Sequence, residues 1–377
     1  MTTRLTARQL NRATLERQML LQRVYREVPD AIAQLVGLQA QEPASPYLTL
    51  WNRLSGFDPA ALDRAFADRS VVKATLMRLT LHAVNHHDYA PFYAAMNRRV
   101  RGSRVGDARF TVSGLTGEEA DALFPVLHQF AGKQARTGPE FEAHLAEQLN
   151  GLREGLWWAL KSYAPLHYAP TGGPWSFKGR LSFRTADRAW EKVTTEQGIR
   201  VLAERYLRAF GPASIADFAQ FTLHTRATAG AAFAALDTVQ RPGPDGVQLF
   251  DLPDCTVPDD DITAPARLLP MWDSTLLAYS ERARIIPPAY RPQVIRRNGN
   301  VLATILIDGL VAGVWRLLDG RVEVTAFHRL PESDWAELAV ESDALLRFLG
   351  DRDPKLYSAY HHWWAKGFDS EEIRLLP

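Results

Sequence analysis

The chain has 377 residues, of which 46% are hydrophobic and 23% charged, a composition typical of a globular protein with two to four domains. Its longest apolar run, residues 301–314, is interrupted by Asp308 and Gly309 and is too short for a membrane helix, so we expect no membrane span. The N-terminal residues lack a secretory pattern and Cys255 is the only cysteine, which excludes a disulfide framework and indicates a cytoplasmic protein.

The net charge of +1 conceals an uneven distribution along the chain. Residues 1–110 carry 16 Lys/Arg against 9 Asp/Glu, whereas residues 251–377 carry 14 against 20. Within residues 98–109, five arginines face only one acidic residue, Asp107, a cation density that suits a phosphate backbone. A solvated helix end explains the same run equally well. The predicted DNA-binding residues of this run are Arg98, Arg99 and Arg101.

Apolar residues at helical spacing predict helices over residues 6–23 and 28–38, and a third helix begins at Pro59. Residues 71–84 are rich in β-formers and divide into two halves around residues 78–80, which predicts a β-ribbon. Helices followed by a short ribbon are the element order of a winged helix.

Two further units repeat this order, although no residue repeat with a fixed period is present. Capping-box signatures at Thr116 and Thr137 open successive helices, and Gly172-Gly173-Pro174 supplies the turn of a second ribbon. The second unit is completed by a predicted helix at residues 153–163 and the ribbon at 167–184. The third unit has predicted helices at residues 194–210, 214–221 and 225–236 and a ribbon at 238–252.

The acidic, proline-containing residues 253–265 are typical of a linker, after which short strand candidates separated by turns predict a small barrel. A helix is expected over residues 333–349. The predicted fold class is therefore α+β, with three tandem winged-helix motifs scaffolding a C-terminal small β-barrel. The predicted domains are residues 1–110, 111–192, 193–254 and 255–377, and the strand candidates of the last are 267–269, 284–286, 294–296, 301–307, 311–317 and 322–327.

The segment Leu268 to Trp315, LLPMWDSTLLAYSERARIIPPAYRPQVIRRNGNVLATILIDGLVAGVW, closely resembles the signature of the AlkZ/YcaQ family of bacterial winged-helix DNA glycosylases. The segments LVGLQAQEPASPYLTLWNRL, from Leu35, and LMRLTLHAV, from Leu76, extend the resemblance across the chain. The resemblance implies three winged-helix units and a barrel, and excision of bulky N7-alkylated purines. It also implies that some relatives unhook interstrand crosslinks or protect producers of DNA-alkylating antibiotics. We accordingly expect a nucleoid-associated monomer that binds double-stranded DNA with alkylated purines.

The AlkZ-like branch of that family is marked by two glutamines around an apolar residue, here Gln39, Ala40 and Gln41. Pro43 biases the preceding residue away from helical geometry, so we expect extended backbone and both carboxamides facing one pocket. A carboxamide is not a strong base and suits only an activated leaving group, such as a cationic N7-alkylguanine. Gln41 is predicted to orient the water and Gln39 to assist, in a monofunctional reaction that depends little on pH. Solvated or capping glutamines at a helix end are the structural alternative.

Arg78 and His82, four residues apart in the first ribbon, are predicted to lie on one side of a strand and contact phosphate or the lesion. A structural histidine is the alternative. Arg296, Arg297 and Asn298 form a basic hairpin tip that suits a minor groove, although a solvated turn has the same sequence features.

His86, His87 and Asp88 are adjacent and lack zinc-ligand spacing, so we expect neither a metal nor a cofactor. The alternative function is a non-catalytic winged-helix transcriptional regulator, which reads the major groove with a recognition helix. Arg226 is the only charged residue in the third helix of the third unit, which is a poor recognition helix. A protein scaffold is a further class and leaves the basic N-terminal region unexplained.

Overall fold

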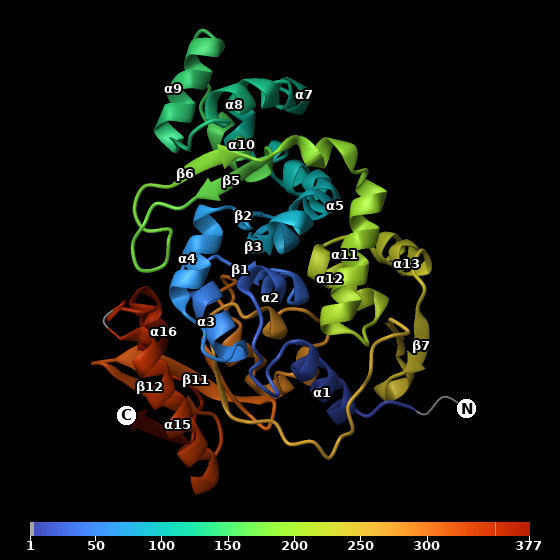
Figure 1. Ribbon diagram of the computed structural model, residues 1–377, viewed down its shortest axis with the longest axis vertical. Helices are drawn as coiled ribbons and strands as arrows, with labels where there is room; N and C mark the ends of the chain where they lie inside the picture. The colour runs from blue at the N-terminus through green and yellow to red at the C-terminus, as the bar shows by residue number, and fades with distance from the viewer. Residues whose placement is uncertain (1–3, 351) are drawn as a thin grey trace.

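The computed structural model describes residues 4–350 and 352–377 as a mixture of helices and antiparallel sheets, which confirms the α+β class (Figure 1). A six-stranded sheet lies in the upper half of the view and a second sheet lies at the lower left, in red, beside the C-terminus. No helix in the described part of the chain is long and apolar enough to cross a membrane.

The N-terminal helices end earlier than their apolar spacing predicts. α1 (Ala7–Arg17) stops before Met19, which has a left-handed φ of +55°, and α2 (Val28–Gln34) stops before Gly37. The strand β1 (Leu38–Gln39) follows directly. α3 (Ser45–Arg53) was not predicted because all nine of its residues are buried, so it lacks the polar face that marks a surface helix.

The six-stranded sheet joins two ribbons that the sequence assigns to different units. Its strand order is β1-β3-β2-β5-β6-β4, and a pair between Lys73 and Tyr168 connects the two ribbons. The division into residues 1–110 and 111–192 therefore stays a prediction, since one sheet spans both ranges. The remaining bounds are α4 (Pro59–Ala67), β2 (Val71–Thr75), β3 (Leu81–Asn85), β4 (Arg136–Thr137), β5 (Leu166–Ala169) and β6 (Ser182–Thr185).

Helices cover this sheet, and the longest of them, α5 (His86–Val105), follows β3 without a loop (Figure 1). The capping boxes predicted at Thr116 and Thr137 are confirmed, because in each the glutamate three residues on accepts from the backbone N–H of the threonine. The other elements are α6 (Ala108–Thr111), α7 (Gly117–Asp121), α8 (Phe124–Ala131), α9 (Gly138–Gln148), α10 (Leu156–Tyr163), α11 (Thr195–Phe210), α12 (Ile215–Thr222), α13 (Arg226–Ala234), β7 (Val239–Pro242) and β8 (Gln248–Asp251).

The C-terminal sheet is antiparallel with the order β13-β12-β11-β10-β9, and α15 packs against it. Two strand candidates are not formed as predicted: residues 284–286 begin at the end of a 3₁₀ turn, and residues 294–296 contain only an isolated bridge, between Ile295 and Val301. Prolines at 287, 288 and 292 explain both, since proline cannot donate to a β-ladder. Closure into a barrel stays a prediction, because β13 and β9 are the two edges. The bounds are β9 (Arg267–Leu269), α14 (Arg291–Val294), β10 (Thr304–Ile307), β11 (Leu310–Leu318), β12 (Arg321–Ala326), α15 (Glu332–Leu349), α16 (His362–Ala365) and β13 (Glu372–Leu376).

One hydrophobic core joins the N-terminal helices to the C-terminal sheet. It contains Leu38 and Ala40 on either side of Gln39, together with Trp315 at the centre of the C-terminal sheet. The segment that carries Gln39 therefore packs against residues from both ends of the chain.

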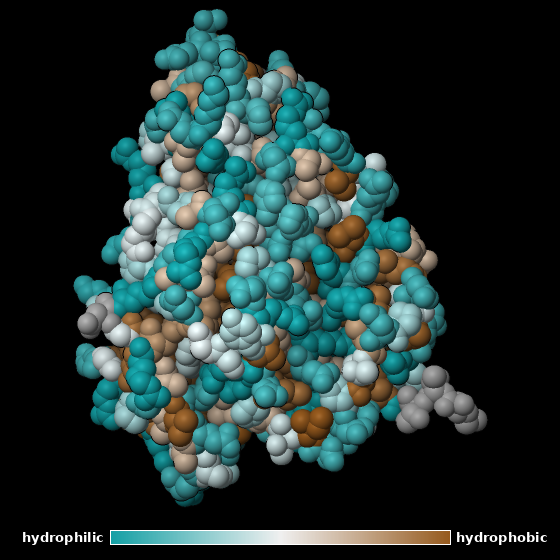
Figure 2. Space-filling model, in the orientation of Figure 1, coloured by the Kyte–Doolittle hydropathy of each residue, from teal (hydrophilic) through white to brown (hydrophobic). Residues whose placement is uncertain are grey.

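The face of the molecule in Figure 2 is mainly hydrophilic, with hydrophobic residues in small scattered groups.

His167 is a buried histidine whose two ring nitrogens have no hydrogen-bond partner in the described part of the chain. Its ring packs edge-on against Tyr89, with centroids 4.2 Å apart. Burial, followed by the charges of Arg69 and His86, lowers the pKa of His167 to about 3. His167 is therefore neutral in the folded protein above about pH 3.

Replacing His167 with phenylalanine is expected to make the protein less sensitive to acid. An unfolded histidine binds a proton near pH 6.5, whereas folded His167 does not bind one until about pH 3. The free energy of unfolding therefore falls as the pH drops below 6.5, by up to about 1.4 kcal/mol per pH unit for this residue. In His167→Phe, urea unfolding between pH 6 and pH 4 should show a slope smaller by about that amount. An unchanged slope would contradict the assignment.

Candidate active site

Gln39 lies in β1, directly after a turn that only glycine fits. Gly37 has a φ of +91°, and a Cβ there would stand 2.7 Å from Cγ1 of Val84 and 3.2 Å from the carbonyl oxygen of Ala83. β1 pairs antiparallel with β3, so that Gln39 lies opposite His82. Because directly paired residues point to the same face of a sheet, their side chains are neighbours. The prediction that Gln39 leaves the helix in extended backbone is confirmed.

The guanidinium of Arg78 contacts both of these side chains. Its Nη2 donates to Oε1 of Gln39 at 2.8 Å and lies 3.3 Å from Nε2 of His82. Nδ1 of His82 lies 3.1 Å from the carbonyl oxygen of Thr80, so Nδ1 carries the ring proton and Nε2 accepts from Arg78. The prediction that Arg78 and His82 share a strand is wrong. Arg78 belongs to the 3₁₀ turn η1 (Met77–Leu79), with a φ of +52°, because the chain reverses there.

Burial fixes the charges of this group. The pKa of His82 is lowered to about 3, first by burial and then by the charge of Arg78. Burial and the nearby Arg282 lower the pKa of Arg78 to about 10, which leaves its guanidinium charged at neutral pH. Neither side chain therefore changes its charge near neutral pH. A fixed cation, Arg78, holds the Gln39 carboxamide, and a neutral imidazole accepts from that cation.

Gln41 lies at a bend after β1, where the chain reaches the surface. Gln39 is 5% exposed and Ala40 is 1% exposed, whereas Gln41 is exposed. The backbone N–H of Ala40 still donates to the carbonyl oxygen of Leu81 at 2.7 Å, so Gln41 is the first residue beyond the ladder. The two glutamines thus differ: Gln39 is held in place inside the protein, and Gln41 is open to solvent.

Aromatic residues from the C-terminal part of the chain cover the segment after Gln41. Tyr360 donates its hydroxyl to Oε2 of Glu42 at 3.2 Å, and burial raises the pKa of Glu42. Trp272 packs against Tyr360 with ring centroids 5.4 Å apart, and its Nε1 donates to the carbonyl oxygen of Gly299 at 3.1 Å. The contacts of Glu42 with Tyr360, of Tyr360 with Trp272 and of Trp272 with Gly299 therefore connect the residue after Gln41 to the predicted basic hairpin.

The three predicted residues of that hairpin differ in their surroundings. Arg296 is half-buried, with its Cζ 5.0 Å from the ring centre of Trp363 and 4.8 Å from that of Phe368. Arg297 and Asn298 are exposed. Only these two have side chains open to a ligand without rearrangement, and Arg296 instead stacks on the aromatic rings that support the hairpin.

The predicted arginines of α5 are also not equivalent. Arg98 and Arg99 are exposed on the helix. Arg101, by contrast, donates from Nε to Asp121 at 2.8 Å and from Nη2 to Glu118 at 3.1 Å. The expectation that this run faces only one acidic residue is wrong, because α7 supplies two further carboxylates that the local sequence does not reveal.

Lys73 is not among the predicted site residues, although a lysine among the β-formers of β2 is unusual. Its Nζ lies 4.3 Å from the ring centre of Phe177, and burial lowers its pKa to about 8. Lys73 pairs with Ala83, whereas Gln39 pairs with His82, the adjacent residue. Because successive residues of a strand face opposite sides, the amine of Lys73 and the carboxamide of Gln39 lie on opposite faces of the sheet.

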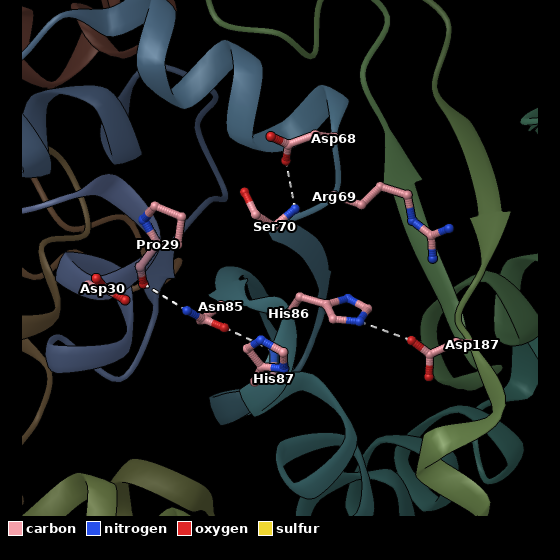
Figure 3. Close-up of a pocket in the computed structure, with 9 residues that line it drawn as sticks. All are labelled: Pro29, Asp30, Asp68, Arg69, Ser70, Asn85, His86, His87 and Asp187. Atoms are coloured by element: carbon pink, nitrogen blue, oxygen red, sulfur yellow. Dashed lines mark hydrogen bonds and ion pairs between the residues drawn. The ribbon is translucent and has the colours of Figure 1, made fainter.

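A separate pocket of 560 Å³ lies at the N-terminus of α5 (Figure 3). Nε2 of His86 lies 3.1 Å from Asp187, and Asn85 caps the helix by accepting from the backbone of His87. In the described residues, no group of three or more His, Cys, Asp or Glu side chains is arranged to hold a metal ion. Gln39 and Gln41 do not line this pocket, so its volume is not that of the candidate catalytic centre.

Comparisons with known proteins agree on one family. The model of the family described as DNA glycosylase AlkZ-like matches residues 32–348. A curated relative, the interstrand DNA cross-link repair glycosylase of Streptomyces sahachiroi, is 27% identical over 355 residues, which cover 88% of this chain and 92% of the relative. The solved structure of DNA glycosylase AlkZ from the same organism superimposes with a TM-score of 0.78 at 23% identity, over 92% of this chain and 98% of that one.

Proposed function

The chain belongs to the AlkZ-like DNA glycosylase family, and from this premise we propose that it hydrolyses the N-glycosidic bond of cationic N7-alkylated purines in double-stranded DNA. The observation that carries the proposal is the pair of glutamines, one held by Arg78 and the other exposed two residues further along the chain. Bulky adducts and interstrand crosslinks are included in the proposed substrates, since the curated relative is named for crosslink repair. The tandem winged-helix motifs and the barrel belong to the same proposal.

The leaving group supplies most of the activation in this reaction. When the bond between C1′ and N9 breaks, its electron pair neutralises the cationic purine, and the sugar acquires oxocarbenium character. A water molecule then adds to C1′ and loses its proton to solvent. Gln41 orients this water through its exposed carboxamide. Gln39 assists through Oε1, which keeps a second lone pair after accepting from Arg78.

The proposed reaction is monofunctional hydrolysis. A lyase reaction needs an amine that reaches C1′ of the abasic sugar, and Lys73, the buried amine of this region, faces the other side of the sheet from Gln39. The membership of the chain in a glycosylase family does not favour the alternative of a non-catalytic regulator.

The protein is expected to release 7-methylguanine from methylated duplex DNA and to leave the strand intact. Free base is measured by chromatography with mass detection, and the abasic product is revealed as a strand break only after treatment with alkali. Unmodified duplex should yield no free guanine. Strand cleavage without alkali, or trapping of a protein–DNA adduct with borohydride, would contradict monofunctional hydrolysis.

A further inference from the structure

Three arginines from separate elements have no carboxylate partner in the described part of the chain, and one of them, Arg78, donates a hydrogen bond to Gln39. Arg78 also lies over Phe221 of α12, with its Cζ 5.0 Å from the ring centre, and Ser280, two residues before Arg282, donates its backbone N–H to Asp217 of the same helix. Arg78 belongs to η1, Arg282 to the 3₁₀ turn η5 (Arg282–Arg284), and Arg291 begins α14. Among the described residues, none of the three has an Asp or Glu oxygen within 4.0 Å, the limit for an ion pair. Many other arginines of the chain are paired, so an unpaired group beside the candidate catalytic centre needs an explanation.

Two nitrogens of this cluster are buried without an acceptor in the described part of the chain: Nη1 of Arg78 and Nε of Arg282. Leaving a charged donor buried and unsatisfied is costly. The three cations also oppose one another. Burial is the largest cause of the lowered pKa of both Arg78 and Arg282, and the charge of Arg282 further lowers the pKa of Arg78. The charge of Arg291 lowers the pKa of Arg282, against a smaller opposing effect of the neighbouring Glu281. The cluster therefore has the properties of a site that an anion completes.

A neighbouring arginine has a different role. Arg284, in the same turn as Arg282, donates to the carbonyl oxygen of Pro212 at 3.0 Å and lies 4.1 Å from the ring centre of Tyr279. Its guanidinium is thus used inside the protein. Arg282 is half-buried and Arg291 is exposed, so both can reach a ligand at the surface.

We propose that Arg282 and Arg291 bind a backbone phosphate of the damaged strand next to the lesion nucleotide, with Arg78 behind them. This inference rests on the proposed function and names how the site holds its substrate. Guanidinium groups match phosphate oxygens geometrically. The phosphate carries one negative charge and so offsets part of the positive charge of the cluster, which otherwise repels both a cationic purine and the positive charge that develops on the sugar. Phosphate binding therefore fixes the strand and makes the surroundings of Gln39 tolerant of a cation.

The first test is DNA binding by Arg282→Gln and Arg291→Gln, measured against salt concentration on a duplex with a stable abasic-site analogue. Each lost phosphate contact should reduce the slope of log K against log[salt] by about 1. The control is Arg200→Gln, because Arg200 is exposed on α11 and makes no ion pair among the described residues. Thermal unfolding of each variant shows whether its fold is retained. Unchanged slopes in both variants would overturn the proposal.

The second test locates the phosphate. In a series of duplexes, one phosphate at a time is replaced by an uncharged methylphosphonate. One position flanking the lesion should weaken binding by the wild type about tenfold and weaken binding by Arg282→Gln no further. Strictly additive losses at every position would overturn the proposal. Because both tests measure binding, failure of base release alone would count against the proposed function, whereas additive losses with intact base release would count against the phosphate site.

Discussion

Replacing Gln39 and Gln41 together with alanine is expected to slow release of 7-methylguanine by about a thousandfold under single-turnover conditions. The variant loses the carboxamide that orients the water and the one that Arg78 holds beside it. Removing a preorganised polar group from a catalytic centre costs about 10²–10³ in rate. The two single variants should each lose much of this, since groups that act on one water are not additive.

The control for this prediction is Gln129→Ala, which removes an exposed glutamine from α8. It should release base at the wild-type rate. Binding to the abasic-site duplex should stay within a few-fold of the wild type in the double variant, because the change removes no cation. Full activity in the double variant would remove the glutamines from the mechanism and leave the family membership intact.

Glu42 is the competing candidate for the base, because it follows Gln41 directly and burial raises its pKa. Glu42→Gln keeps a hydrogen-bond acceptor for Tyr360 and removes the ionisable group. If the glutamines act on a pre-activated purine, this variant should retain activity within a few-fold, and base release should vary little with pH in both proteins. A large loss, together with the disappearance of an acid limb, would assign the role of base to Glu42.

The backbone conformation at Gln39 could be predicted from the sequence, whereas the residues that contact this part of the site could not. Pro43 is a local signal, and it correctly predicted extended backbone at Gln39. The division of the ribbon around residues 78–80 located the reversal at Arg78, but the contact of Arg78 with Gln39 depends on the pairing of β1 with β3, for which the sequence gives no signal. Tyr360 reaches Glu42 from 318 residues away, and only the packing of the C-terminal segment brings the two together.

The same distinction explains the errors in the fold. Segments with one buried face, such as α11, show their helical spacing in the sequence. The helix α3 is buried on all sides, so its pattern carries no period that could separate it from a loop or a strand. The residues around Arg284 are rich in β-formers, but the prolines that follow prevent a ladder.

The buried ion pair between Arg53 and Asp273 is an interaction whose loss should strongly destabilise the protein. Arg53 donates from Nη1 and Nη2 to the two carboxylate oxygens, each at 2.9 Å, and both residues are almost fully buried. Asp273→Ala leaves the guanidinium without its counter-charge. It should lower the free energy of unfolding by about 3–5 kcal/mol, measured by urea denaturation.

Two comparisons distinguish burial of the charge from loss of a contact. Asp343→Ala removes an exposed carboxylate from Arg347 on α15 and should cost less than about 1 kcal/mol. In the double variant Arg53→Met with Asp273→Leu, both charges are absent, and much of the lost stability should return, because apolar residues of similar size can replace a buried pair. No recovery would mean that the pair is needed for its geometry. Since Arg53 ends the helix that follows Gln41, recovered stability without recovered base release would show that this ion pair also positions the catalytic segment.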